Sequence, residues 1–90
     1  MNDKIRLFVK KVVFHSGIRN EFEIKEIEEG KRISFVINSP DNATYRIRIW
    51  NTDEKGIDFT LFKENGDEML EVMTERYYFS TGRFYKRVGK

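Results

Sequence analysis

The sequence contains no cysteine, a single proline and a single histidine, and these scarcities exclude several kinds of chemistry. Without cysteine the chain forms neither a disulfide nor a thiolate nucleophile, and it cannot build a cysteine-ligated zinc or iron–sulfur centre. With His15 as the one imidazole, any metal site would depend on carboxylates, so we expect no metal ion and no cofactor. The glycines lie singly along the chain, which excludes a glycine-rich phosphate loop.

Long apolar runs are also missing. No run approaches the roughly 18 residues that a membrane helix needs, and residues 1–4 lack the basic and apolar segments of a secretory signal. We therefore expect a cytoplasmic protein that does not bind a membrane. A chain of 90 residues can bury one hydrophobic core and is too short for two, so residues 1–90 are expected to form a single domain.

Leucine and alanine are scarce, at three residues and one, whereas isoleucine and valine together number 15 and aromatic residues 13. β-Branched and aromatic side chains lose rotamer freedom on a helix but pack well on a pleated sheet. This balance argues against a helical bundle and predicts an all-β chain.

Alternation of apolar and polar residues supports that prediction. Three runs alternate clearly, over 33–37, 44–50 and 57–61. Turn-forming residues follow the first run around Pro40, and the Asn65-Gly66 pair predicts a type I′ hairpin turn. We expect an antiparallel meander of seven or eight short strands, closed as a small barrel or sandwich so that its apolar face is covered.

Two segments fit more than one element, and each is a candidate for one short helix. In residues 5–14 the apolar positions satisfy both strand alternation and helical spacing, so either element is open there. In residues 67–76 several good helix formers compete with the alternation of Leu70 and Val72, and we favour a strand.

Charge is segmented along the chain. Residues 51–75 carry a net charge of −6, whereas residues 76–90 carry +5 together with five aromatic side chains and no acidic one. Acidic and basic blocks on successive strands are typical of a solvated surface with cross-strand pairs. Strand alternation nevertheless predicts that arginine and aromatic side chains share one outward face. This expected binding surface consists of Arg46, Arg48, Trp50, Arg76, Tyr78, Tyr85 and Arg87.

Three functional hypotheses follow from that surface. Because arginine, tryptophan and tyrosine dominate the hot spots of protein interfaces, the first is a noncatalytic protein-interaction or assembly module that binds a protein partner or a second copy. The alternative is a single-stranded nucleic-acid-binding domain, whose rings would stack on bases while arginines neutralise phosphates. The third is a small metal-independent ribonuclease. Its candidate residues are His15, Arg76, Tyr78 and Arg83, but their spacing does not show that they converge, so we expect no enzyme.

Overall fold

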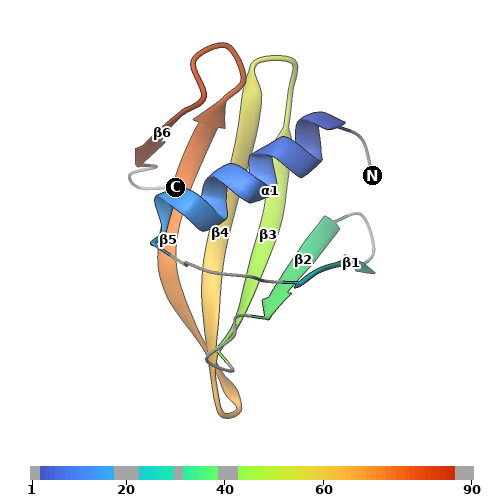
Figure 1. The fold of residues 1–90 in the computed structure, drawn as a ribbon, viewed down its shortest axis with the longest axis vertical. Coiled ribbons are helices and arrows are strands. Elements are labelled where there is room, and N and C mark those ends of the chain that lie inside the picture. The colour runs from blue at the N-terminus through green and yellow to red at the C-terminus, as the bar shows by residue number, and fades with distance from the viewer. Residues whose placement is uncertain (1–2, 18–22, 30–31, 39–42, 87–90) are drawn as a thin grey trace.

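The chain forms one helix followed by six antiparallel strands in a computed structural model that describes residues 3–17, 23–29, 32–38 and 43–86. The elements are α1 (Asp3–His15), β1 (Glu23–Glu29), β2 (Arg32–Asn38), β3 (Thr44–Thr52), β4 (Gly56–Asn65), β5 (Glu68–Tyr78) and β6 (Arg83–Lys86). Each strand pairs with the next one in sequence, so the sheet order is β1-β2-β3-β4-β5-β6 (Figure 1).

The sheet is open, with β1 and β6 as its two edges. The predicted antiparallel meander is therefore confirmed. Closure as a barrel or sandwich is not found, and the described residues form six strands rather than seven or eight. The physical reason is α1, which crosses one face of the sheet and covers its apolar side chains, so the sheet need not fold back on itself (Figure 1).

Segment 5–14, which fits both strand and helix in sequence, lies within the helix α1. Helical spacing gathers its buried side chains on one stripe, where each of them is at most 2% exposed. These side chains are Phe8, Val9, Val12 and Val13. Asp3 lies in the first turn, where a carboxylate interacts favourably with the helix dipole. Within the described part of the chain, no helix combines the length and apolar character required to span a bilayer.

The core lies between α1 and the face of the sheet that we call the inner face. The Phe8 ring meets Phe59 edge-on at a centroid distance of 5.0 Å and lies 5.4 Å from the ring of Tyr77. The buried inner-face residues are Phe35, Ile37, Ile47, Ile49, Ile57, Phe59, Leu61 and Tyr77. They come from β2 to β5, so one cluster joins the helix to four strands.

The favoured strand in segment 67–76 is confirmed as part of β5. β4 and β5 form a hairpin whose turn contains Gly66 at φ 65°, the left-handed conformation that the Asn65-Gly66 pair predicts. This hairpin extends beyond the area that α1 covers (Figure 1). As a result Leu70 and Val72 are each 45% exposed.

Two register shifts interrupt the ladders. One shift lies between Ile49 and Asn51 in β3, where Trp50 is the extra residue. The other lies in the pairing of β4 with β5, where Val72 is the extra residue. Bulges of this kind locally redirect side chains and increase strand twist. Trp50 therefore departs from the regular alternation on which its predicted position was based.

Candidate binding surface

The sheet face opposite α1 carries most of the predicted surface residues. Cross-strand pairing places Arg46 beside Phe62 and Arg48 beside Thr60. It also places Arg76 between Asp58 and Tyr85. Trp50 is half-buried and does not belong to the core cluster. We call this the outer face. Cross-strand pairing assigns to it Arg46, Arg48, Asp58, Thr60, Phe62, Arg76, Tyr78 and Tyr85, and we count Trp50 of the β3 bulge with it.

The predicted residues differ in how accessible they are. Arg46, Arg48, Trp50 and Tyr78 are half-buried, and Tyr85 on the edge strand is 51% exposed. Arg87 lies outside the described residues.

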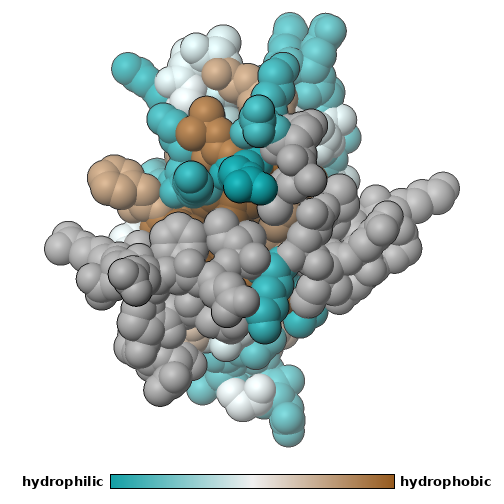
Figure 2. Space-filling view, turned by 45° about the vertical axis from the view of Figure 1, so that its right-hand side comes forward, coloured by the Kyte–Doolittle hydropathy of each residue, from teal (hydrophilic) through white to brown (hydrophobic). Residues whose placement is uncertain are grey.

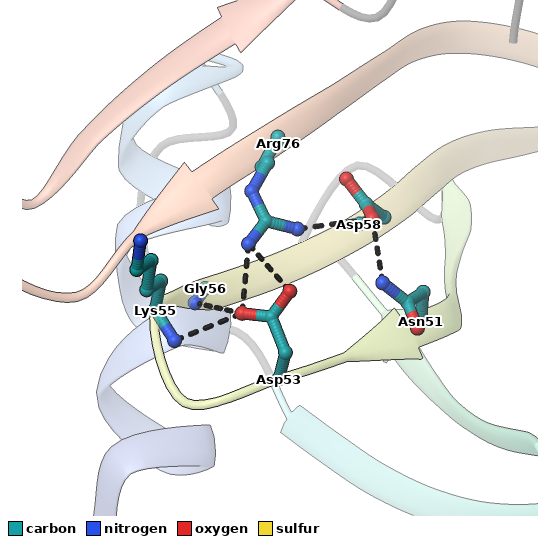
Figure 3. Close-up of polar contacts among 6 residues, drawn as sticks. All are labelled: Asn51, Asp53, Lys55, Gly56, Asp58 and Arg76. Carbon is teal, nitrogen blue, oxygen red and sulfur yellow. Dashed lines mark hydrogen bonds and ion pairs between the residues drawn. The ribbon is translucent and has the colours of Figure 1, made fainter.

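The prediction that Arg76 belongs to an exposed surface is wrong, because the residue is only 8% exposed. Its Nη2 donates to both carboxylate oxygens of Asp53 at 2.8 Å, and its Nη1 donates to Oδ2 of Asp58 at 3.0 Å (Figure 3). Alternation assigns Arg76 to a face, but the two carboxylates that cover its guanidinium come from other segments. Arg76 is therefore a structural cation of the outer face.

These contacts belong to a network that ties β3, β4 and β5 together. Asn51 Nδ2 donates to the same Asp58 oxygen at 3.0 Å, while the backbone N–H groups of Lys55 and Gly56 donate to Asp53 Oδ1 (Figure 3). The hydrogen bond from Arg76 and then that from the Lys55 backbone hold the pKa of Asp53 below its ordinary value. Hydrogen bonding to Asp53 in turn raises the pKa of Arg76.

The network continues into two tyrosines. The Arg76 guanidinium carbon lies 5.0 Å from the centroid of the Tyr78 ring, a cation–π contact. Tyr78 meets Tyr85 edge-on, with centroids 5.4 Å apart. These two rings, with Ser80 and Thr81, line a hollow of about 400 Å³.

A larger hollow, which we call the α1–β6 groove, lies between the C-terminal end of α1 and the β6 hairpin. Its volume is about 690 Å³, and it is lined by Lys11, Phe14, His15, Gly82, Arg83, Phe84 and Tyr85. Sequence reasoning missed Lys11, Phe14 and Phe84 as site residues, because α1 and β6 are far apart in the sequence and meet only in the folded molecule. The one local signal was Phe14, whose ring lies off the buried stripe of the helix and is 88% exposed.

The surface seen obliquely from the side of α1 mixes two kinds of residue. Among the coloured residues, small apolar areas (brown) adjoin larger hydrophilic ones (teal) (Figure 2). Besides Phe14, the helix exposes Leu7, which is 51% accessible. The exposed positions of α1 thus include the apolar residues Leu7 and Phe14 and the basic residues Lys10 and Lys11.

The four residues of the ribonuclease hypothesis do not line one hollow. His15 and Arg83 border the α1–β6 groove, whereas Tyr78 lines the smaller hollow and Arg76 lies in the ion-pair network. His15 Nε2 lies 3.0 Å from Glu75 Oε1. No group of three potential metal-ligating side chains occurs among residues 3–17, 23–29, 32–38 and 43–86.

Comparison with known proteins assigns this chain to no group: no protein family model matches it, and neither a curated protein nor a solved structure is significantly similar to it.

Proposed function

We propose that this domain is a noncatalytic protein-interaction or assembly module that binds a protein partner, or a second copy of itself, through the outer face. One observation carries the proposal. α1 covers only the inner face of the sheet, while the outer face presents arginine and aromatic side chains above a buried ion-pair network.

The residue types on the outer face support contact with a protein. Arg46, Arg48, Trp50 and Tyr78 are half-buried in the free domain, so part of their motion is already restricted. Such side chains lose less conformational entropy on binding than fully exposed ones do. Arginine, tryptophan and tyrosine also contribute most often to interface hot spots.

The geometry of the face is set before any partner arrives. Arg76 joins the Asp53 turn to Asp58 on β4 and supports the ring of Tyr78 from β5. At the other end of the face, Arg46 Nη2 lies 3.7 Å from Glu64 Oε1. Preorganisation of this kind lowers the cost of ordering an interface.

Site-specific photo-crosslinking tests the proposal. A benzophenone amino acid replaces Phe62, which lies on the outer face, and in a matched control it replaces Leu7, which lies outside that face on α1. The proposal predicts that irradiation in the producing cells yields discrete protein adducts from position 62 and far fewer from position 7. Sedimentation velocity on the purified protein then separates a second copy from a different partner.

Each outcome decides between hypotheses. A discrete protein adduct at position 62, whether with a second copy or another chain, supports the interaction module. Adducts with nucleic acid at position 62 would replace it by the single-stranded nucleic-acid hypothesis. Equal labelling from positions 62 and 7, or none from either, would overturn the outer face as the contact surface.

A further inference from the structure

We infer that the α1–β6 groove binds a nucleoside phosphate, either free or within a single-stranded nucleic acid. The groove lies beside β6 and is lined chiefly by residues outside the outer face, so this inference goes beyond the proposed protein interaction.

The groove supplies cations that the fold does not use. Within the described residues, neither Lys11 nor Arg83 takes part in an ion pair, and both are exposed. Arg76, by contrast, is neutralised by Asp53 and Asp58. Two exposed cations that line one hollow attract an anion. In nucleic acids, phosphate is the anion that lysine and arginine bind.

The Glu75 carboxylate contacts His15, a residue that lines the groove. Glu75 lies against His15, with Oε1 3.0 Å from Nε2, and it pairs across the strands with Lys86. The Glu75 side chain is 11% exposed, so it contributes little negative surface. The accessible charge of the groove therefore comes from Lys11 and Arg83.

Two aromatic residues line the same hollow, Phe14 of α1 and Tyr85, whose ring also meets Tyr78 on the outer face. Phe14 is 88% exposed and Tyr85 is 51% exposed, the highest values among the exposed large hydrophobic residues on their respective elements. A phenylalanine this open gains almost nothing from the hydrophobic effect in the free domain. Planar rings beside cations are the combination that stacks on bases while phosphates are neutralised.

The floor of the groove continues the hydrophobic core. The imidazole of His15 stacks on Phe84 at 4.3 Å with an interplanar angle of 9°. Phe84 in turn packs against Tyr77 at 5.0 Å and Phe59 at 5.8 Å. This chain of rings connects the end of α1 and β6 to the core.

Gly82 lies close to the Lys11 side chain at the groove. It adopts φ 67°, and a Cβ atom at this position would lie 3.2 Å from Lys11 Nζ. A glycine therefore lets the lysine amine reach from α1 to the turn before β6.

Among possible occupants, a nucleoside phosphate can contact both the two cations and the two aromatic residues of the groove. An acidic peptide would engage Lys11 and Arg83 and leave the two rings exposed, whereas an apolar peptide would cover the rings and leave the cations without a counter-charge. The volume of about 690 Å³ lies in the range of small-ligand sites. The combination of aromatic residues and cations in the groove therefore favours a ligand in which a base is joined to a phosphate.

Titration of the ¹⁵N-labelled full chain, followed by NMR, tests the inference. The probes are adenosine monophosphate, inorganic phosphate, adenosine and a short oligouridylate. We expect adenosine monophosphate or the oligouridylate to shift the amides of Lys11, Phe14, His15 and Arg83, and to bind more tightly than phosphate or adenosine alone. The mononucleotide and the oligonucleotide distinguish a free ligand from a strand.

Two matched pairs of variants on α1 localise the site. Phe14→Ser removes the ring from the groove, and Leu7→Ser removes an exposed apolar residue outside it. Lys11→Gln and Lys10→Gln form the corresponding pair for charge. We expect Phe14→Ser and Lys11→Gln each to weaken binding at least about five-fold, whereas their controls leave it unchanged.

The inference is overturned if no probe shifts the groove amides, or if the control variants weaken binding as much as the groove variants do. It is also overturned if phosphate alone binds as tightly as the nucleotide, because the rings would then make no contribution. All four positions lie outside the outer face, so a negative result here leaves the proposed protein interaction intact.

Discussion

At the scale of single residues, Arg76 shows that an arginine next to aromatic residues can serve the fold rather than a ligand. Its position on the outer face follows from strand alternation, but its burial depends on Asp53 in a turn and Asp58 on a neighbouring strand. A cation becomes structural when carboxylates from other segments desolvate and neutralise it. Arg83, which has the same side chain, remains exposed because no described carboxylate reaches it.

The first prediction compares these two arginines. Arg76→Ala removes the cation beside Asp58, a carboxylate that is only 1% exposed. Breaking a buried ion pair on one side costs about 3–5 kcal/mol of unfolding free energy. Arg83→Ala is expected to change stability by no more than about 0.5 kcal/mol. Urea denaturation of both variants measures the difference, and equal losses would contradict the structural role of Arg76.

The second prediction concerns acid stability. Because the Arg76 hydrogen bond lowers the pKa of Asp53 below 3.8, the unfolded chain takes up this proton before the folded one as the pH falls. The stabilisation is therefore present above about pH 4 and is lost as the pH falls through the lowered pKa. Asp53→Asn removes this dependence, so below about pH 4 the wild type should lose stability more steeply than the variant. Parallel stability curves from denaturation across this pH range would count against the coupling.

At the scale of elements, the first segment shows why local pattern left the element type open. In residues 5–14, Ile5, Leu7 and Val9 fit a strand, whereas Ile5, Phe8, Val9 and Val12 fit helical spacing. Only a helix turns Phe8, Val9 and Val12 toward the sheet as one stripe. This arrangement is favoured because it buries these side chains against the apolar inner face. Segment 67–76 forms a strand instead, because most of its residues pair with β4.

The third prediction compares two phenylalanines on α1. Phe8→Ala removes a ring that is fully buried, and the lost contacts and remaining cavity should cost about 3–5 kcal/mol. Phe14→Ala truncates a ring that is 88% exposed, so stability should change by no more than about 0.5 kcal/mol. Thermal or chemical denaturation of the pair measures this contrast. A large loss from Phe14→Ala would show that the ring is covered in solution.

The fourth prediction concerns the start of β4. A Cβ atom at Gly56 would overlap the carbonyl oxygen of Tyr77 on β5, so only glycine allows the two strands to approach here. Gly56→Ala should cost about 1–3 kcal/mol because one backbone must shift. Lys55→Ala in the same turn is the control, with an expected change within about 0.5 kcal/mol. Comparable stability of both variants in denaturant would contradict the close approach.

At the scale of the whole molecule, one helix buries the apolar face of an open meander, so the sheet does not have to close. The sequence analysis predicted that the sheet closes on itself to bury its apolar face, and closure would have required more strands. α1 performs this task instead, and its cluster with β2 to β5 leaves the outer face uncovered by the helix. The two candidate sites follow from the same arrangement: the outer face opposes the helix, and the α1–β6 groove forms where the helix ends beside the edge strand.

The fifth prediction follows from this single core. Because residues of α1 and of four strands belong to one buried cluster, helix and sheet should unfold in a single cooperative transition. Thermal unfolding followed by Trp50 fluorescence and by far-ultraviolet circular dichroism should give coincident curves. Separate transitions would show that α1 and the sheet are independent units.

The sequence by itself determined the antiparallel strand pattern, the Asn65-Gly66 turn and the residue types of the outer face. These features depend on alternation and turn chemistry, which act between close neighbours in the chain. Only the tertiary structure decided that α1 replaces barrel closure, that Arg76 is buried and that Lys11 and Phe14 meet Arg83 across a groove. Each of these depends on side chains from distant segments that compete for the same buried surface or charge, and no local pattern records the outcome of that competition.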